Sequence, residues 1–105
     1  MVNFPCVLKL DGDDELIYVN SEHDLLAECT SLIFHDNDRL IDSNGLQYII
    51  QINNNEDLSL LTEGKVLTTN EVTELIQADQ FAKAEVCLTK IQFKSVADAI
   101  KSLSA

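Results

Sequence analysis

The sequence predicts an α+β fold, with helices packed on a mainly antiparallel sheet built from two hairpins. Two observations support this prediction. Short β-prone runs flank an Asp-Gly turn and an Asn-Gly turn, and capping residues precede apolar residues at helical spacing. The expected order is ββαββ, a short irregular or paired segment, then αβα. A chain of 105 residues with 46% apolar residues fits one domain over residues 1–105.

The first hairpin is expected from residues 6–10 and 15–19, which are rich in Val, Ile, Leu and Tyr and flank an Asp-Gly turn. Ser21 is the predicted N-cap of a helix that extends to about residue 34. Glu22 and Asp24 in its first turn favour the positive end of the helix dipole. The expected inward stripe of this helix is Leu25, Leu26, Cys29, Leu32 and Ile33.

The second hairpin is expected around Asn44-Gly45, because a type I′ turn needs positive φ at two central residues that Asn and Gly tolerate. This turn would pair Ile41 with Tyr48. Alternate residues of the following strand would then form its core face. These residues are Leu46, Tyr48, Ile50 and Ile52.

Residues 58–61 and 65–67 flank Glu63-Gly64 and are predicted to form a short strand pair. Thr68 and Glu71, three residues apart, match the capping box that begins a helix.

The apolar run 86–93 suits a buried strand or a continued helix, and we favour the strand. Ser95 is predicted to cap a last helix. Its expected inward residues are Val96, Ala99, Ile100 and Leu103.

Three stretches, DGDDELIYV, DSNGLQYII and AEVCLTKIQFKSVADAIKSL, together resemble a family of small, acidic, uncharacterised proteins from marine gammaproteobacteria. That family is classed as a domain of unknown function. The resemblance covers most of the chain, and it implies an α+β fold and a bacterial cytosolic home. It implies no activity and assigns no functional residue.

The net charge of the chain is concentrated in its first part. The chain holds 18 acidic and 7 basic residues, a net charge of −11. Residues 1–61 hold twelve acidic and two basic residues, a net charge of −10. Such a field repels phosphate backbones and anionic lipids and attracts basic protein surfaces, so we expect neither nucleic acid nor membrane as a partner.

The acidic residues on predicted turns and helix starts are expected to be exposed and to contact a partner. They are Asp11, Asp13, Asp14, Glu22, Asp24, Asp36 and Asp38. The first functional hypothesis is therefore a non-catalytic cytoplasmic interaction module that binds a basic protein. A homo-oligomer is the alternative partner.

Two further polar groups are candidates for chemistry. Asp11, Asp13, Asp14 and Glu15 surround one turn and offer oxygen ligands of the kind that calcium prefers, although the EF-hand spacing is absent. A solvated turn is the alternative. His35, with Asp36, Asp38 and Asp42 following, has the residue types of an acid–base or metal site, and a helix-terminal His followed by a loop is the alternative.

No residue is assigned as catalytic, and no cofactor is expected, because the sequence has no Gly-rich phosphate loop and no HExxH motif. Cys6, Cys29 and Cys87 are odd in number and far apart, which predicts reduced structural thiols. The N-terminus lacks the pattern of a signal peptide, and no apolar run reaches the roughly 18 residues of a membrane span. A cytoplasmic location is therefore expected.

Two other functions remain open. One is a small ligand-binding protein or enzyme with a pocket between sheet and helices, using Cys87 or a carboxylate. The other is an acidic nucleic-acid mimic whose carboxylates imitate phosphates.

Overall fold

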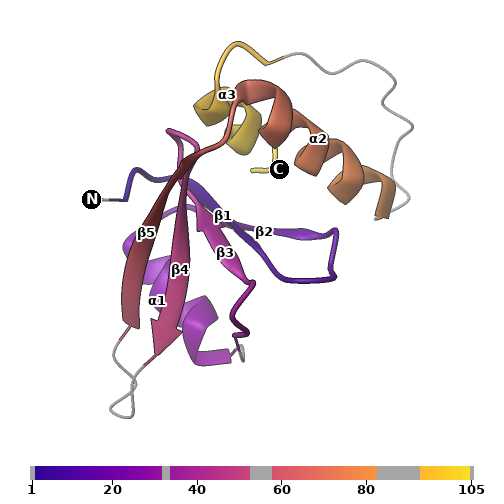
Figure 1. Cartoon of the computed structure of the whole chain (residues 1–105). Coiled ribbons are helices and arrows are strands. Elements are labelled where there is room, and N and C mark those ends of the chain that lie inside the picture. The colour runs from indigo at the N-terminus through magenta and orange to yellow at the C-terminus, as the bar shows by residue number, and fades with distance from the viewer. Residues whose placement is uncertain (1, 32–33, 53–57, 83–92, 105) are drawn as a thin grey trace.

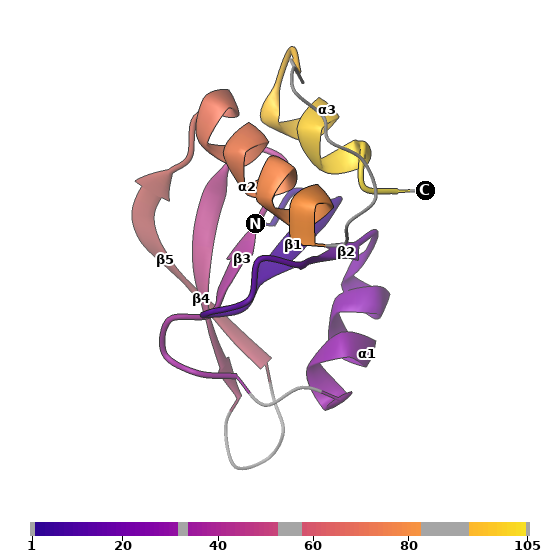
Figure 2. The same ribbon diagram turned by 90° about the vertical axis from the view of Figure 1, so that its right-hand side faces the viewer.

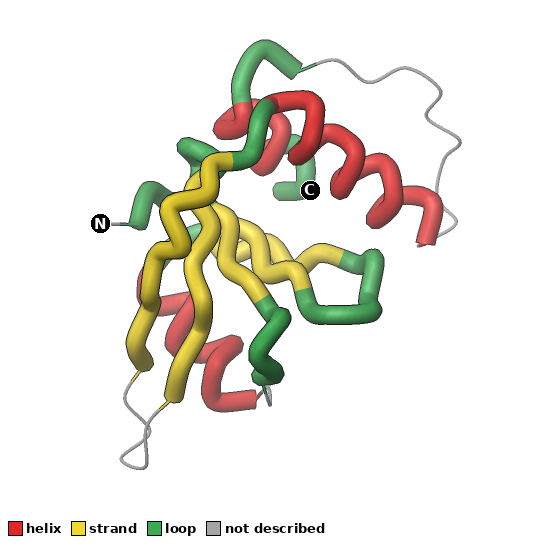
Figure 3. The backbone as a smooth tube through the Cα atoms, viewed as in Figure 1, coloured by secondary structure: helices red, strands yellow, loops and turns green. Residues whose placement is uncertain are grey.

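The computed structural model describes residues 2–31, 34–52, 58–82 and 93–104 (Figure 1). The strands form one antiparallel sheet of order β2-β1-β3-β4-β5 (Figure 3), so the predicted α+β class is confirmed. The elements of this part of the chain are β1 (Cys6–Lys9), β2 (Leu16–Val19), α1 (Glu22–Ser31), β3 (Arg39–Ile41), β4 (Leu46–Ile52), β5 (Leu58–Val66), α2 (Thr69–Ala82) and α3 (Val96–Lys101).

Both faces of the sheet carry helices. In Figure 2, α2 and α3 lie together on one side of the sheet, and α1 lies apart from them. Because successive strand residues point to opposite faces, Leu8 of β1 faces α1, whereas Val7 faces α2 and α3. The core on the α1 face comprises Cys6, Leu8, Val19, Leu25, Cys29, Leu40, Tyr48 and Ile50. The core on the opposite face comprises Val7, Leu16, Ile41, Val72, Ile76, Val96, Ala99 and Ile100.

The helix starts follow the predicted caps. The Thr68 amide donates to Glu71 Oε1 at 3.0 Å, and the Glu71 amide donates to Thr68 Oγ1 at 3.2 Å, which is a reciprocal capping box. Ser21 Oγ accepts from the Asp24 amide at 3.3 Å. Ser95 Oγ caps α3 in the same way, so local sequence decides where these helices begin.

The second hairpin forms, but its predicted register and type I′ turn are wrong. Leu40, not Ile41, pairs with Tyr48. The Gly45 amide donates to the Asp42 carbonyl at 2.9 Å. Gly45 is the last residue of the loop, and its φ is +85°. This is a three-residue loop, which adds one residue to the predicted turn. The shift places Leu40 and Tyr48 on the α1 face and turns Ile41 to the other face.

The predicted short pair around Glu63-Gly64 is one nine-residue strand, β5. It pairs with β4 from Leu58↔Ile52 onward, and the register shifts between Leu46 and Tyr48 of β4. Gly64 lies opposite this irregularity with a φ of +76°. Glycine therefore serves a bulge here rather than a turn, and β5 continues because β4 offers it a partner.

The predicted strand over 86–93 lies outside the described residues, apart from Phe93, which packs against the core beneath α2 and α3. The last helix is confirmed. Val96, Ala99 and Ile100 are buried, and Leu103 packs against the same core.

Replacing Ile100 by Ala should lower the free energy of unfolding by about 3 kcal/mol, because Ile100 is fully buried and its truncation leaves a cavity. The measurement is a urea titration of both proteins. Val66→Ala is the control, since Val66 is 62% exposed and should change the stability by less than about 0.5 kcal/mol. Equal losses in the two variants would show that α3 adds nothing to the core.

Candidate functional site: an apolar groove beside the first helix

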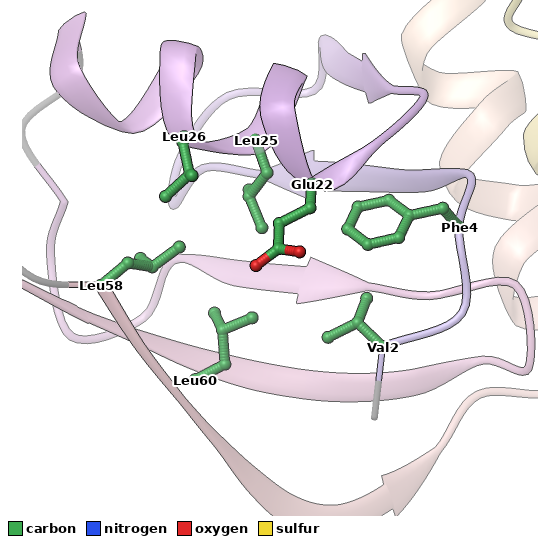
Figure 4. Close-up of a pocket in the computed structure, with 7 residues that line it drawn as sticks. All are labelled: Val2, Phe4, Glu22, Leu25, Leu26, Leu58 and Leu60. Carbon is green, nitrogen blue, oxygen red and sulfur yellow. The ribbon is translucent and has the colours of Figure 1, made fainter.

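An apolar groove lies between α1, the N-terminal segment and β5 (Figure 4). Its volume is about 700 Å³, which is within the range of small-ligand and side-chain pockets. The residues that line it are Val2, Phe4, Glu22, Leu25, Leu26, Leu58 and Leu60.

Each wall of the groove follows from local structure. Leu58 and Leu60 are two residues apart on β5, so both point to the face that carries α1. The side chains of Leu25 and Leu26 extend from α1 toward the groove, and Phe4 closes the end of the groove beside the N-terminal segment (Figure 4). The groove is therefore the part of this sheet face that α1 leaves uncovered beside β5.

Sequence patterning did not place Leu26 correctly. It assigns Leu25 and Leu26 to one buried stripe, but Leu25 is 1% exposed and Leu26 is 46% exposed. Consecutive residues lie about 100° apart around a helix axis, so one contact with the sheet covers only one of them. Ile52, predicted on the core face of β4, is also 41% exposed.

The carboxylate of Glu22 is the polar group of the groove. Glu22 is the first residue of α1, and its carboxylate points into the space between Phe4 and Leu60 (Figure 4). Among the described residues, no cation or hydrogen-bond donor pairs with this carboxylate. Apolar walls around one unpaired carboxylate suit an apolar group that carries a positive charge.

The exposed acidic residues that the sequence assigns to a partner surface lie in two regions at opposite ends of β2. Glu22 and Asp24 are exposed on α1, which follows β2. The loop before β2 and the loop before β3 are joined, because the Asp11 amide donates to Asp38 Oδ1 at 2.7 Å. The exposed carboxylates of these two loops, called the acidic loop cluster below, are Asp11, Asp13, Asp14, Glu15 and Asp36.

Asp38 does not belong to this exposed set, so the expectation that it contacts solvent is wrong. It is 2% exposed, and its Oδ2 accepts from the His35 amide at 2.8 Å while Oδ1 accepts from Asp11. Amides at the ends of loops need acceptors when they are buried, and Asp38 supplies them for two loops at once. Its role is to hold the acidic loop cluster together.

The candidate cation-binding turn is organised by hydrogen bonds to its own backbone. Asp13 Oδ1 accepts from the Glu15 amide at 2.9 Å, and Lys9 Nζ donates to the carbonyls of Leu10 and Asp13. Across the described residues, no group of three or more His, Cys, Asp or Glu side chains is arranged to hold a metal ion. With Asp14, whose side chain is exposed, the turn has the geometry of a solvated loop.

The predicted group of His35 with Asp36, Asp38 and Asp42 does not assemble as one site. Asp38 precedes β3 and Asp42 follows it, so the strand separates them. His35 is exposed, whereas Asp42 is fully buried in the hairpin loop.

Both basic residues of the first 61 are engaged within the protein. Lys9 binds the two carbonyls of the β1–β2 loop. Arg39 makes a bidentate pair with Glu63, with Nε–Oε2 and Nη2–Oε1 distances of 3.0 Å each. Neither cation forms an ion pair with the acidic loop cluster in the described residues, and twelve acidic against two basic residues leave this part of the chain with a net charge of −10.

The described cysteines have the properties of structural thiols. Cys6 is fully buried and Cys29 is 7% exposed. Burial, with a smaller contribution from Asp42, raises the pKa of the Cys6 thiol to about 12. Burial followed by the charge of Glu28 raises the pKa of Cys29. Both thiols stay protonated at neutral pH, which makes them poor nucleophiles. Cys87 lies outside the described residues.

The stability of the protein should fall as the pH rises from about 9 to 12. In the unfolded state the Cys6 thiol loses its proton near the ordinary pKa of 9.0, whereas in the folded state its pKa is about 12. Between these two pKa values, deprotonation therefore favours the unfolded state. Cys6→Ala should show a shallower fall. The burial of Tyr48 raises its pKa in the same direction, but Tyr48 is present in both proteins. Urea midpoints measured across this pH range test the difference, and parallel curves would contradict a buried Cys6 thiol.

None of the helices in the described residues combines the length and the apolar character that a membrane span needs.

Comparison with known proteins places the chain in a family. An NMR structure of a protein from Shewanella amazonensis shares the fold, with a TM-score of 0.73, 24% sequence identity, and coverage of 99% of this chain and 89% of that one. No curated protein matches the sequence. Residues 4–103 match the DUF4144 family, described as a protein structure with unknown function. The resemblance drawn from the sequence is thus confirmed, and the chain belongs to the DUF4144 family.

Proposed function

We propose that this protein is a non-catalytic interaction module of the cytoplasm that binds a basic protein through the acidic surface of its first 61 residues. One observation supports this function above others. The acidic loop cluster is exposed, and none of its carboxylates forms an ion pair in the described residues, because Lys9 donates to backbone carbonyls and Arg39 pairs with Glu63. Such a negative surface steers and orients a positively charged partner.

The cluster is also held in place before any partner arrives. Asp38 ties the two loops of the cluster together through the amides of Asp11 and His35. Charges on ordered loops lose less conformational entropy on binding than charges on mobile ones, which favours association. The same field opposes the phosphates of nucleic acids and anionic lipids.

The test is fluorescence anisotropy with a labelled Lys/Arg-rich peptide and with labelled duplex DNA. The peptide should bind at an ionic strength of about 0.01 M and bind more weakly at about 0.15 M, because salt screens exposed charges. The DNA should not bind. The double variant Asp11→Lys/Asp14→Lys should weaken peptide binding about tenfold.

The matched control is Asp98→Lys, which is compared with the single variant Asp14→Lys, because each replaces one exposed acidic residue by Lys and Asp98 lies on α3. It should leave most of the affinity intact. Equal loss in both variants, or tight binding of DNA, would contradict the proposal.

A further inference from the structure

We infer that the groove between α1 and β5 docks an amphipathic helix of the basic partner, and that a Lys or Arg of this helix pairs with Glu22. The inference rests on the proposed function, since it assigns a docking site to the same partner. It concerns a separate part of the surface from the acidic loop cluster, so the two can be tested apart.

The arrangement of helices on the sheet favours a helix as the occupant. Two helices, α2 and α3, cover one face, whereas in the described residues α1 is the helix on the other face (Figure 2). Beside α1, Leu58 and Leu60 of β5 and the half-exposed Leu26 remain open to the groove. A helix lying there would complete the layer, with apolar residues three and four apart packing on these leucines.

The charge inside the groove favours a basic helix. A helix seated on Leu60 and Phe4 would remove water from the Glu22 carboxylate, which pairs with no described residue. Burying an unpaired carboxylate is costly, so the occupant must supply a cation. A Lys or Arg fits because its aliphatic stem can lie along apolar walls while its charged end reaches Glu22.

Other occupants meet an electrostatic penalty. A second copy of this chain has the same net charge of −11, and a fatty acid has a carboxylate of its own. Both would bring negative charge toward Glu22, whereas a basic helix brings the opposite charge.

The test uses three synthetic peptides on an Ala-rich helical background. The first has Leu at positions i, i+3, i+4 and i+7, with Lys beside this stripe. The second has the same composition in scrambled order, and the third has Glu in place of Lys. The first peptide should bind the full chain in calorimetry, and the other two should bind at least about tenfold more weakly.

Matched variants of the protein locate the binding. Leu60→Asp should weaken the first peptide at least about tenfold, because it puts a charge on the groove floor. Leu61→Asp should have little effect, since Leu61 is the next residue of β5, 48% exposed on the opposite face. Glu22→Gln should weaken binding about three- to fivefold, and Asp24→Asn, which removes the same charge on the same turn, should not.

A charge exchange completes the test. Glu22→Lys should lose the Lys peptide and gain the Glu peptide if the two side chains meet. The inference is overturned if the first peptide binds no better than the scrambled one, or if Leu60→Asp and Leu61→Asp behave alike. It is also overturned if sedimentation shows a dimer that Leu60→Asp dissociates, because a second copy would then fill the groove.

The outcomes separate this inference from the proposed function. Peptide binding that Asp11→Lys/Asp14→Lys abolishes and Leu60→Asp leaves intact would refute the groove and retain the acidic surface. Peptide binding that Leu60→Asp abolishes and Asp11→Lys/Asp14→Lys leaves intact would refute the acidic loop cluster as the binding surface and retain the groove.

Discussion

Replacing Asp42 by Ala should lower the free energy of unfolding by about 3–5 kcal/mol, one of the two largest effects we expect in this protein. Asp42 is fully buried, and its carboxylate gathers several donors. Its Oδ1 accepts from the amides of Asn44 and Leu46 at 2.9 and 3.0 Å. Its Oδ2 accepts from the Tyr48 hydroxyl at 3.2 Å and from the Asn3 amide at 3.3 Å. Truncation to Ala would leave these buried donors without a hydrogen-bond acceptor.

The measurement is a urea titration of three proteins. Asp36→Ala is the control, because Asp36 is exposed and its loss should change the stability by less than about 0.5 kcal/mol. Asp42→Asn should fall between wild type and Asp42→Ala, since an amide oxygen keeps part of the acceptor capacity. If Asp42→Ala is as stable as Asp36→Ala, the buried carboxylate does not organise the hairpin.

Asp42 also connects the hairpin with the groove. Asn3, which donates to it, lies between Val2 and Phe4, and both of these line the groove. Ser43 reinforces the attachment, because its amide donates to the Asn3 carbonyl at 2.9 Å. Loss of Asp42 should therefore loosen the N-terminal wall of the groove as well as the hairpin.

Gly45→Val should destabilise the protein by about 3–5 kcal/mol through two costs that add. The first is backbone strain, because a β-branched residue at a φ of +85° is unfavourable. The second is steric, because a Cβ at this position would clash with the carbonyl oxygen of Leu67. That backbone is held close, since the Leu67 amide donates to the Gly45 carbonyl at 2.8 Å.

Gly12→Val separates the two costs. Gly12 has a similar φ of +79°, but a Cβ there would meet nothing within 4 Å. It should therefore cost only the strain, about 1–3 kcal/mol. Thermal or urea unfolding of both variants gives the comparison, and equal destabilisation would mean that the contact with Leu67 yields without cost.

Local patterns predicted the elements of this fold well. Thr68 and Glu71 begin α2 as a capping box, and Ser21 and Ser95 cap the other helices. Caps and hairpin turns involve residues only a few positions apart, so their hydrogen bonds can be inferred from a short window of sequence. The run over 86–93 stays a prediction.

The register of the second hairpin could not be predicted from local sequence, because it depends on a contact made in the tertiary structure. The Asn44-Gly45 pair is compatible with a two-residue or a three-residue loop. The side chain of Asp42, held by the distant Asn3, favours the longer loop by binding the amides of Asn44 and Leu46. Likewise β5 becomes one strand because β4 pairs with it on both sides of the bulge at Gly64.

The candidate site shows the same division. The order of residues was enough to predict the excess of acidic charge, the α+β class, the helix starts and the family to which the chain belongs. The burial of Asp38, the exposure of Leu26 and the groove that Glu22 shares with Leu60 became evident in the folded structure. Composition and caps depend on neighbours in the chain, whereas burial and grooves depend on which distant elements pack together. α1 and β5 lie far apart in sequence, so the groove between them exists only once the sheet has placed them on the same face.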